Sequence, residues 1–282
     1  MAKKRFRRSR FSSPVIRKFN IIRENTNKIA IAIVIGLVLV AAGILLAVTG
    51  RNKVSDIPAL MLKKEIVVGI STENDRFASV DDSGRLTGYE PELAELILGS
   101  LCPDASLKFV HIEDQEASYL LRAGKIDIAF AMLVPGNIKA QGLSLSSAYY
   151  QDDIAVYSTE SRANEGISSV GGTKVFYVEA KKQSVSDLFE SQGVKNVRLL
   201  QSGSYPDAVI SVTESSVYAV AAPRHKGEKF LHSLYEIPTE SSVTVPYSAA
   251  VWTTNSSFMD FFNAKLAELS EENADLKKRW GI

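Results

Sequence analysis

The hydrophobic and polar positions of the chain follow two different patterns, which change near residue 50. Residues 29–48 are twenty consecutive positions without a charged or polar side chain. As a helix this run would be about 30 Å long, the thickness of the hydrocarbon core of a bilayer. From residue 63 onward, short apolar runs alternate with amphipathic segments, as in a globular domain. The pattern therefore predicts a single transmembrane helix followed by one folded body.

The folded body is predicted to alternate strands with helices. Short runs rich in Val, Ile and Leu predict strands over residues 65–70, 107–112, 126–133, 153–157, 174–178, 197–201, 217–222 and 247–253. Apolar residues at helical spacing predict helices over residues 91–97, 118–122, 185–192, 205–212, 258–269 and 273–280, with Pro91 at a first helical position. This alternation favours an α/β fold with an open, mostly parallel sheet, and the number of units favours two lobes.

Charge predicts the orientation of the chain in the membrane. Residues 1–28 contain ten basic residues and one acid, a net charge of +9, whereas the whole chain carries +1, so the remainder carries −8. Basic residues next to a membrane segment stay in the cytoplasm. We therefore expect a cytoplasmic N-terminus and an extracytoplasmic body. Basic clusters also bind nucleic acid, but membrane topology accounts for this one more simply, so no nucleic-acid partner is expected.

The apolar run has two interpretations, a retained anchor and a cleaved signal peptide. Signal peptides have a shorter apolar region followed by small residues at the cleavage site. Here the run has full span length and leads into Ala47-Val48-Thr49-Gly50, a poor cleavage site, which favours the anchor. The single cysteine, Cys102, lies in an apolar helical run and is expected to be buried. The three histidines lack the spacing of a metal site, so neither a metal nor a cofactor is expected.

Several segments taken together resemble a known family. The segments LTGYEPELAELI, LLRAGKIDIAFAML and SAYYQDDIAVYS occur in an order and at a spacing similar to those of bacterial extracellular solute-binding proteins of family 3. The resemblance implies a two-lobed periplasmic-binding-protein-like fold of type II, with the ligand between the lobes. The organisation expected for the chain is a basic arm (1–28), a transmembrane helix (29–49), a linker (50–62) and a solute-binding domain (63–282), with lobe one at 63–156 and 247–282 and lobe two at 157–246. The chain would cross between the lobes near 156–158 and 243–247.

The resemblance also implies ligand-binding positions in lobe one. Phe77 falls where the family places an aromatic residue against the ligand, although a core aromatic is an equal alternative. Counting from Asp127, the family's carboxylate-binding arginine falls on Lys139, and its threonine positions become Val134 and Gly136. Lysine attracts a carboxylate but cannot form the planar, bidentate contact of arginine. Lys139 is thus a candidate ligand contact or a solvated surface lysine.

Lobe two departs further from the family pattern. The position of the acid that receives a ligand's ammonium group is occupied by Pro223. The family's Gly-Thr pair is replaced within residues 180–184, where Lys181 and Lys182 would face the cleft or solvent and Ser184 would cap a helix. A buried zwitterion would have its charges poorly paired, so the pattern disfavours α-amino acids and favours an anionic solute without an amine.

Two functions follow from these observations. The first is a membrane-anchored extracytoplasmic protein that captures a small polar or anionic solute for an ABC permease or a membrane sensor. The second is a degenerate module that keeps the fold for protein interaction or sensing without a ligand. An enzyme is not expected, because the sequence shows neither a nucleophile–base set nor a suitably spaced carboxylate pair.

Overall fold

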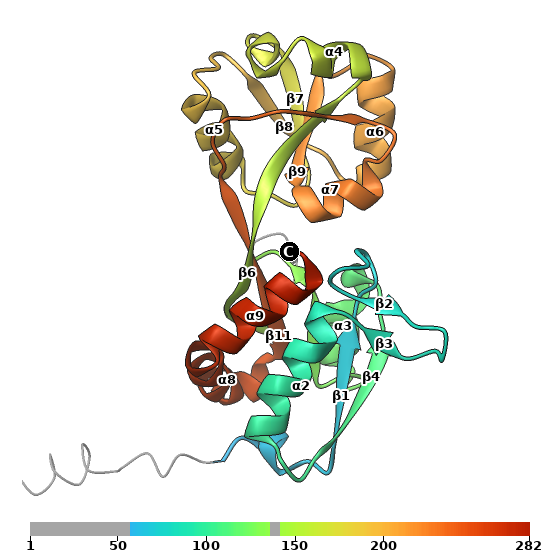
Figure 1. Ribbon diagram of the computed structural model, residues 1–282, viewed down its shortest axis with the longest axis vertical. Coiled ribbons are helices and arrows are strands. Elements are labelled where there is room, and N and C mark those ends of the chain that lie inside the picture. The colour runs from blue at the N-terminus through green and yellow to red at the C-terminus, as the bar shows by residue number, and fades with distance from the viewer. Residues whose placement is uncertain (1–56, 136–141) are drawn as a thin grey trace, which may run out of the picture. The chain divides into compact units, whose positions relative to one another are not determined.

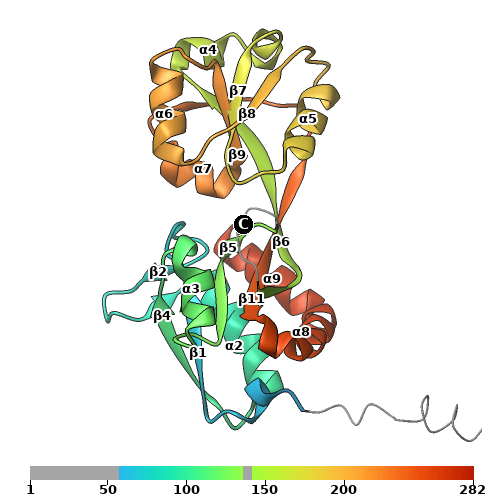
Figure 2. The same ribbon diagram turned by 180° about the vertical axis from the view of Figure 1, so that it is seen from behind.

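The computed structural model describes residues 57–135 and 142–282 (Figures 1 and 2). The predicted arm, transmembrane helix and most of the linker lie outside the described residues, as do Gly136 and Lys139. Within the two described ranges, none of the helices has the length and apolar character needed to cross a membrane. Residues 57–282 form one compact unit.

Lobe one is built on four strands in the order β4, β1, β5 and β11. Their bounds are Ser106–His111, Glu65–Ile70, Ile128–Leu133 and Thr244–Trp252, in that order. Strand β1 runs parallel to β4 and β5, whereas β11 is antiparallel to β5. All six residues of β5 are buried, which explains why its sequence is a continuous apolar run. A short hairpin, β2 (Ser79–Val80) and β3 (Leu86–Thr87), follows β1.

Four helices pack on lobe one: α2 (Tyr89–Leu101), α3 (Ala117–Arg122), α8 (Ser256–Glu268) and α9 (Ser270–Trp280). Short 3-10 helices are found at Ala59–Leu62, Asp114–Glu116 and Thr253–Asn255. The ring of Phe130 on β5 lies 5.9 Å from that of Phe262 on α8. This contact joins the first half of the chain to its C-terminal helices, which lie beside α2 in Figure 1.

Strand β6 (Leu143–Ser158) is 16 residues long and belongs to both lobes. Its residues 143–153 pair antiparallel with β11, and its residues 154–158 pair with β9 and β10. Figure 2 shows β6 and β11 running together from one lobe toward the other. These two strands therefore carry the chain between the lobes. The lobe boundaries expected from the sequence stay a prediction.

Lobe two contains three parallel strands in the order β9, β7 and β8, next to β6. Their bounds are Ala219–Pro223, Lys174–Tyr177 and Arg198–Gln201, and the short strand β10 spans Tyr235–Ile237. The helices are α4 (Glu160–Asn164), α5 (Lys182–Ser191), α6 (Tyr205–Thr213) and α7 (Arg224–Phe230), with a 3-10 helix at Ile167–Val170. The sheet is thus mixed rather than mostly parallel, because β6 and β11 run against their neighbours.

The structure confirms each strand and helix expected from the sequence, and except for one strand their ends agree within a few residues. The largest extension is at β6, where the strand expected over 153–157 begins ten residues earlier, at Leu143. Pro91 is the third residue of α2 rather than the first, because the helix begins at Tyr89. Helices α4 and α7, the short strands β2 and β3 and strand β10 were not expected.

Candidate functional site

The segment after β1 meets helix α7 where the two lobes come together (Figure 1). Asn74 donates from Nδ2 to the carbonyl oxygen of His225, at 2.9 Å. Arg76 forms an ion pair of 2.9 Å with Glu228. Because the segment follows β1 and α7 follows β9, both lie at the carboxyl ends of parallel strands. Ligands of open α/β sheets bind at such ends.

A buried lysine lies at the centre of this junction. The Lys226 side chain on α7 is 2% exposed. Its Nζ is 3.2 Å from Oε2 of Glu73, after β1, and 2.7 Å from Oε2 of Glu179, after β7. Tyr205 donates its hydroxyl to the same Glu179 oxygen at 3.3 Å. An ammonium group is costly to bury unless carboxylates compensate its charge, and here one carboxylate from each lobe contacts it.

Glu90 on α2 is a second buried charge-bearing group near this cluster. Its Oε1 accepts hydrogen bonds from the backbone N–H of Met132, at 2.9 Å, and from the Tyr149 hydroxyl. The pKa of Glu90 is raised to about 7, chiefly by burial and to a smaller extent by the charge of Glu73, whereas the two hydrogen bonds and the charge of Lys226 lower it. Among the described residues, Oε2 of Glu90 has no hydrogen-bond partner.

Asp152 on β6 fixes the start of helix α7. The carboxylate is fully buried and accepts a hydrogen bond from the backbone N–H of His225 at 3.1 Å. Its other oxygen, Oδ1, is 2.7 Å from Nδ1 of the His225 ring, and the Tyr247 hydroxyl donates to Oδ2, the oxygen that also accepts from the His225 N–H. Strands β6 and β11 therefore position the helix that carries Lys226.

Phe77 is fully buried in a cluster of rings rather than exposed to a cavity. Its ring packs edge-on against Tyr89, Tyr150, His225 and Tyr247, with centroid distances of 5.7, 5.0, 5.2 and 5.7 Å. Such edge-to-face contacts are favourable for aromatic pairs. In this arrangement Phe77 packs the junction between the segment after β1 and α7.

The candidate residues of lobe two lie at the start of α5. Lys181 and Lys182 are exposed, and the helix begins at Lys182 without a side-chain cap. The expectation that Ser184 caps this helix is therefore wrong, since Ser184 is its third residue. Pro223 ends β9 and directly precedes α7. Its correspondence to the family's acid stays a prediction.

The functional candidates that sequence reasoning missed are the carboxylates and the lysine of the junction. Glu73, Glu179 and Lys226 are far apart in the sequence. Each is of a residue type that is usually exposed to solvent. One signal was present, because Lys226 follows within three residues of the buried strand β9.

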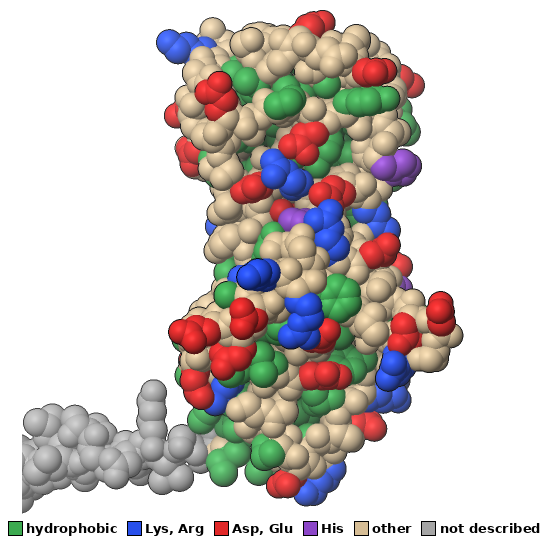
Figure 3. All heavy atoms as spheres, in the orientation of Figure 1, with side chains coloured by type: hydrophobic (Ala, Val, Ile, Leu, Met, Phe, Trp, Pro, Cys, Tyr) green, Lys and Arg blue, Asp and Glu red, His purple; other side chains and the backbone are tan. Residues whose placement is uncertain are grey.

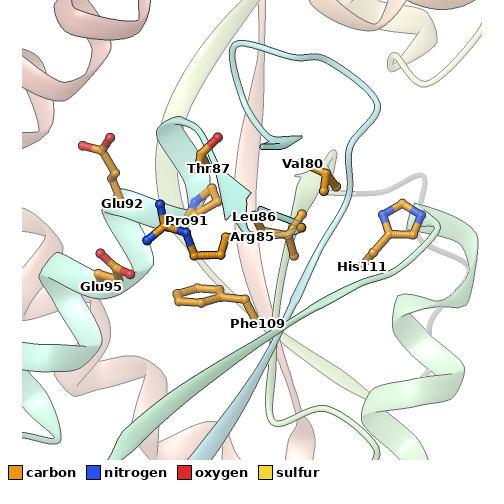
Figure 4. A pocket seen from close by; sticks show the side chains of 10 residues that line it. Val80, Arg85, Leu86, Thr87, Pro91, Glu92, Glu95, Phe109 and His111 are labelled. Carbon is orange, nitrogen blue, oxygen red and sulfur yellow. The ribbon is translucent and has the colours of Figure 1, made fainter. Parts of the chain in front are cut away.

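Two surface pockets lie away from this cluster. A pocket of about 520 Å³ lies between the β2–β3 hairpin, α2 and β4, with Arg85, Glu95 and Phe109 on one side and His111 on the other (Figure 4). A smaller one of about 370 Å³ lies in lobe two beside Tyr235 and Gly166. Figure 3 shows acidic and basic side chains intermingled on the surface at the level of α7. In the described parts of the chain, no group of His, Cys, Asp and Glu could hold a metal ion.

Comparison with known proteins gives a family and a fold. The family model described as "Bacterial extracellular solute-binding proteins, family 3" matches residues 66–282. No curated protein sequence matches the chain.

Several solved structures are similar in fold. An ancestral arginine-binding protein bound to arginine is 18% identical with a TM-score of 0.54, and the match covers 77% of this chain and 98% of that one. An arginine 3rd transport system periplasmic binding protein from Legionella pneumophila is 15% identical with a TM-score of 0.56, over 77% of this chain and 100% of that one. An ancestral amino acid-binding protein, a precursor of cyclohexadienyl dehydratase, is 15% identical with a TM-score of 0.54, over 78% and 96%.

Proposed function

Since the chain belongs to the bacterial extracellular solute-binding proteins of family 3, we propose that it captures a small polar solute between its two lobes. The proposal rests on one observation, which is that polar groups from both lobes converge on one point. Glu73 of lobe one and Glu179 of lobe two converge on one ammonium nitrogen, that of Lys226. A solute that bridges two lobes requires groups from each lobe to point at the same place.

The chemistry of the junction favours polar amino acids as the first solutes to test. Acidic and basic side chains meet at this junction, where Glu73 and Glu179 contact Lys226 and Glu228 contacts Arg76, as suits a polar solute. The similar structures include proteins bound to arginine and to glutamine, which supports the same class. An anionic solute stays a prediction that depends on Lys139, Lys181 and Lys182.

Calorimetry on the purified full chain tests this proposal, with arginine, glutamine and a dicarboxylate as ligands. Saturable heat with at least one ligand supports solute capture. Lys139→Ala tests the carboxylate contact that the resemblance implies, because loss of the ammonium group should weaken every ligand whose carboxylate Lys139 binds. A free amino acid that binds the variant as tightly as wild type would contradict that contact. Absence of heat with every ligand would contradict capture of these solute classes.

The proposed cellular role is that of a receptor held at the outer face of the bacterial membrane by residues 29–49. The support is the uncharged run of twenty residues and the +9 charge of the segment before it. The partner would be an ABC permease or a membrane sensor. Protease added to intact cells should digest the chain after Arg51 and spare residues 1–28. Protection of the body would contradict this topology.

A ligand-free interaction module is the second candidate, and one observation favours it. The junction is filled by the chain's own side chains, since Lys226 and Phe77 are both buried there. The two pockets described above also lie elsewhere. A protein of this kind would give no heat with small solutes and would instead retain a membrane partner after crosslinking in cells.

A further inference from the structure

We propose that Glu73 and Glu179 form an ammonium-binding site between the lobes, which the chain occupies with its own Lys226. The site thus takes a primary ammonium group, and the lysine acts as a ligand tethered to lobe two. This inference goes beyond solute capture, because it concerns the occupant that is present without any solute.

The contacts define the site from both lobes. Nζ of Lys226 lies 3.2 Å from Glu73 and 2.7 Å from Glu179. The side chains of Lys226 and Glu73 are 2% and 7% exposed, and that of Glu179 is 25% exposed. An ammonium group carries three donors and no acceptor, so it requires several acceptors around it when buried. Carboxylates from two different lobes meet that requirement only when the lobes are together.

The surroundings of Lys226 differ from those of a lysine in an ordinary surface ion pair. Lys229 lies on the same helix, and its Nζ donates to the carbonyl oxygen of Thr72 at 2.7 Å. That contact also joins the two lobes, but it is exposed to solvent, where such contacts contribute little. Lys226 is instead enclosed, and its charge acts on the buried Glu90. The helix therefore holds one buried and one exposed lysine, a matched pair for experiment.

Burial of Lys226 by its own chain has a consequence for recognition. A tethered group has a high effective concentration at its site, so a free ammonium competes poorly with it. The wild-type chain should therefore admit no free ammonium group at this point. A variant that lacks the lysine side chain should admit one.

Chemical rescue tests the proposal on the full chain. Lys226→Ala removes three methylene carbons and the ammonium group, which together correspond to n-propylammonium. We expect the variant to unfold at a lower temperature than wild type. Added n-propylammonium should raise its unfolding temperature in a saturable manner, with a dissociation constant on the order of millimolar for so small a ligand.

The controls isolate the charge and the site. The neutral n-propanol should not rescue the Lys226→Ala variant, and n-propylammonium should leave wild type and Lys229→Ala unchanged. Glu179→Gln placed in the Lys226→Ala background should abolish the rescue. If Lys226→Ala alone does not fold, recovery of folding in n-propylammonium is the supporting result.

The proposal is overturned if n-propylammonium fails to stabilise Lys226→Ala, or if n-propanol stabilises it equally. It is also overturned if the rescue survives Glu179→Gln. These outcomes are distinct from those of the calorimetry with amino acids. Failed rescue leaves solute capture standing, and absence of heat with amino acids leaves the ammonium site standing.

Discussion

Replacement of Glu90 by glutamine should change how the stability of the protein depends on pH. Glu90 is fully buried, and burial raises its pKa from the usual 4.5 to about 7 in the folded chain. The folded state therefore keeps its proton over a range in which the unfolded chain has already lost it. The contribution of Glu90 to the free energy of unfolding is therefore fully present below pH 4.5 and is lost as the pH rises to about 7.

The size of the effect follows from the difference between the two pKa values. Each pKa unit corresponds to about 1.4 kcal/mol, so the rise from 4.5 to about 7 corresponds to about 3 kcal/mol, as an upper limit. Glutamine has the shape of the protonated acid and keeps an oxygen for the N–H of Met132 and the hydroxyl of Tyr149. It carries no charge at any pH, so the variant should lack this part of the pH dependence.

Urea unfolding at pH 5, 6, 7 and 8 measures the effect on wild type and Glu90→Gln. We expect nearly equal free energies of unfolding at the lowest pH, and a variant that is more stable than wild type by up to about 3 kcal/mol at the highest. The charges that face Glu90 are those of Lys226 and Glu73, so Glu73→Gln serves to separate their influence. A difference between Glu90→Gln and wild type that is the same at every pH would refute the reasoning.

Two further substitutions test the packing of helix α7. Asp152→Asn removes the buried charge that binds His225. We therefore expect the free energy of unfolding, measured in urea, to fall by about 2–4 kcal/mol. A fall of less than about 0.5 kcal/mol, the range of surface substitutions, would contradict this expectation. At Gly227 a methyl group would come within 2.6 Å of the Tyr157 ring, so Gly227→Ala should cost about 1–3 kcal/mol. Gly99→Ala, with open space at the Cβ position in helix α2, is the matched control and should stabilise by about 0.5–1 kcal/mol. Equal effects of the two alanines would show that the Tyr157 contact is unimportant.

The sequence predicted the buried strands well because their signal is local. Strand β5 is buried along its whole length, so its apolar run is visible in any short window. The first part of β6 was missed for the opposite reason. Its alternation of apolar and polar residues covers only residues 143–146 and ends at Ser147, and Gln151 and Asp152 follow as two consecutive polar residues. Its partner β11 is about a hundred residues away, and only that pairing makes it a strand.

The interlobe cluster could not be predicted, because its members compensate one another only in three dimensions. Lys226 stands in the basic segment RHKGEKF, where a glycine and four basic residues suggest a solvated turn. Its burial depends on Glu73 and Glu179, which come from other strand ends. The resemblance placed Phe77 at a functional position, but its contacts with four rings are a matter of packing. Lys139 and Gly136 stay predictions, since they lie outside the described residues.

The route of the chain through lobe one has a consequence for biosynthesis. Strand β5 is paired on one side by β1, but its other side and the ring of Phe130 are covered by β11 and by Phe262. These covering segments are made last, after the strands of lobe two. A nascent chain that stops before Thr244 would therefore expose an apolar strand edge, which is prone to aggregation. Lobe two can complete its sheet earlier. Lobe one, although its first strands are synthesised first, can finish folding only after the C-terminal segments are synthesised.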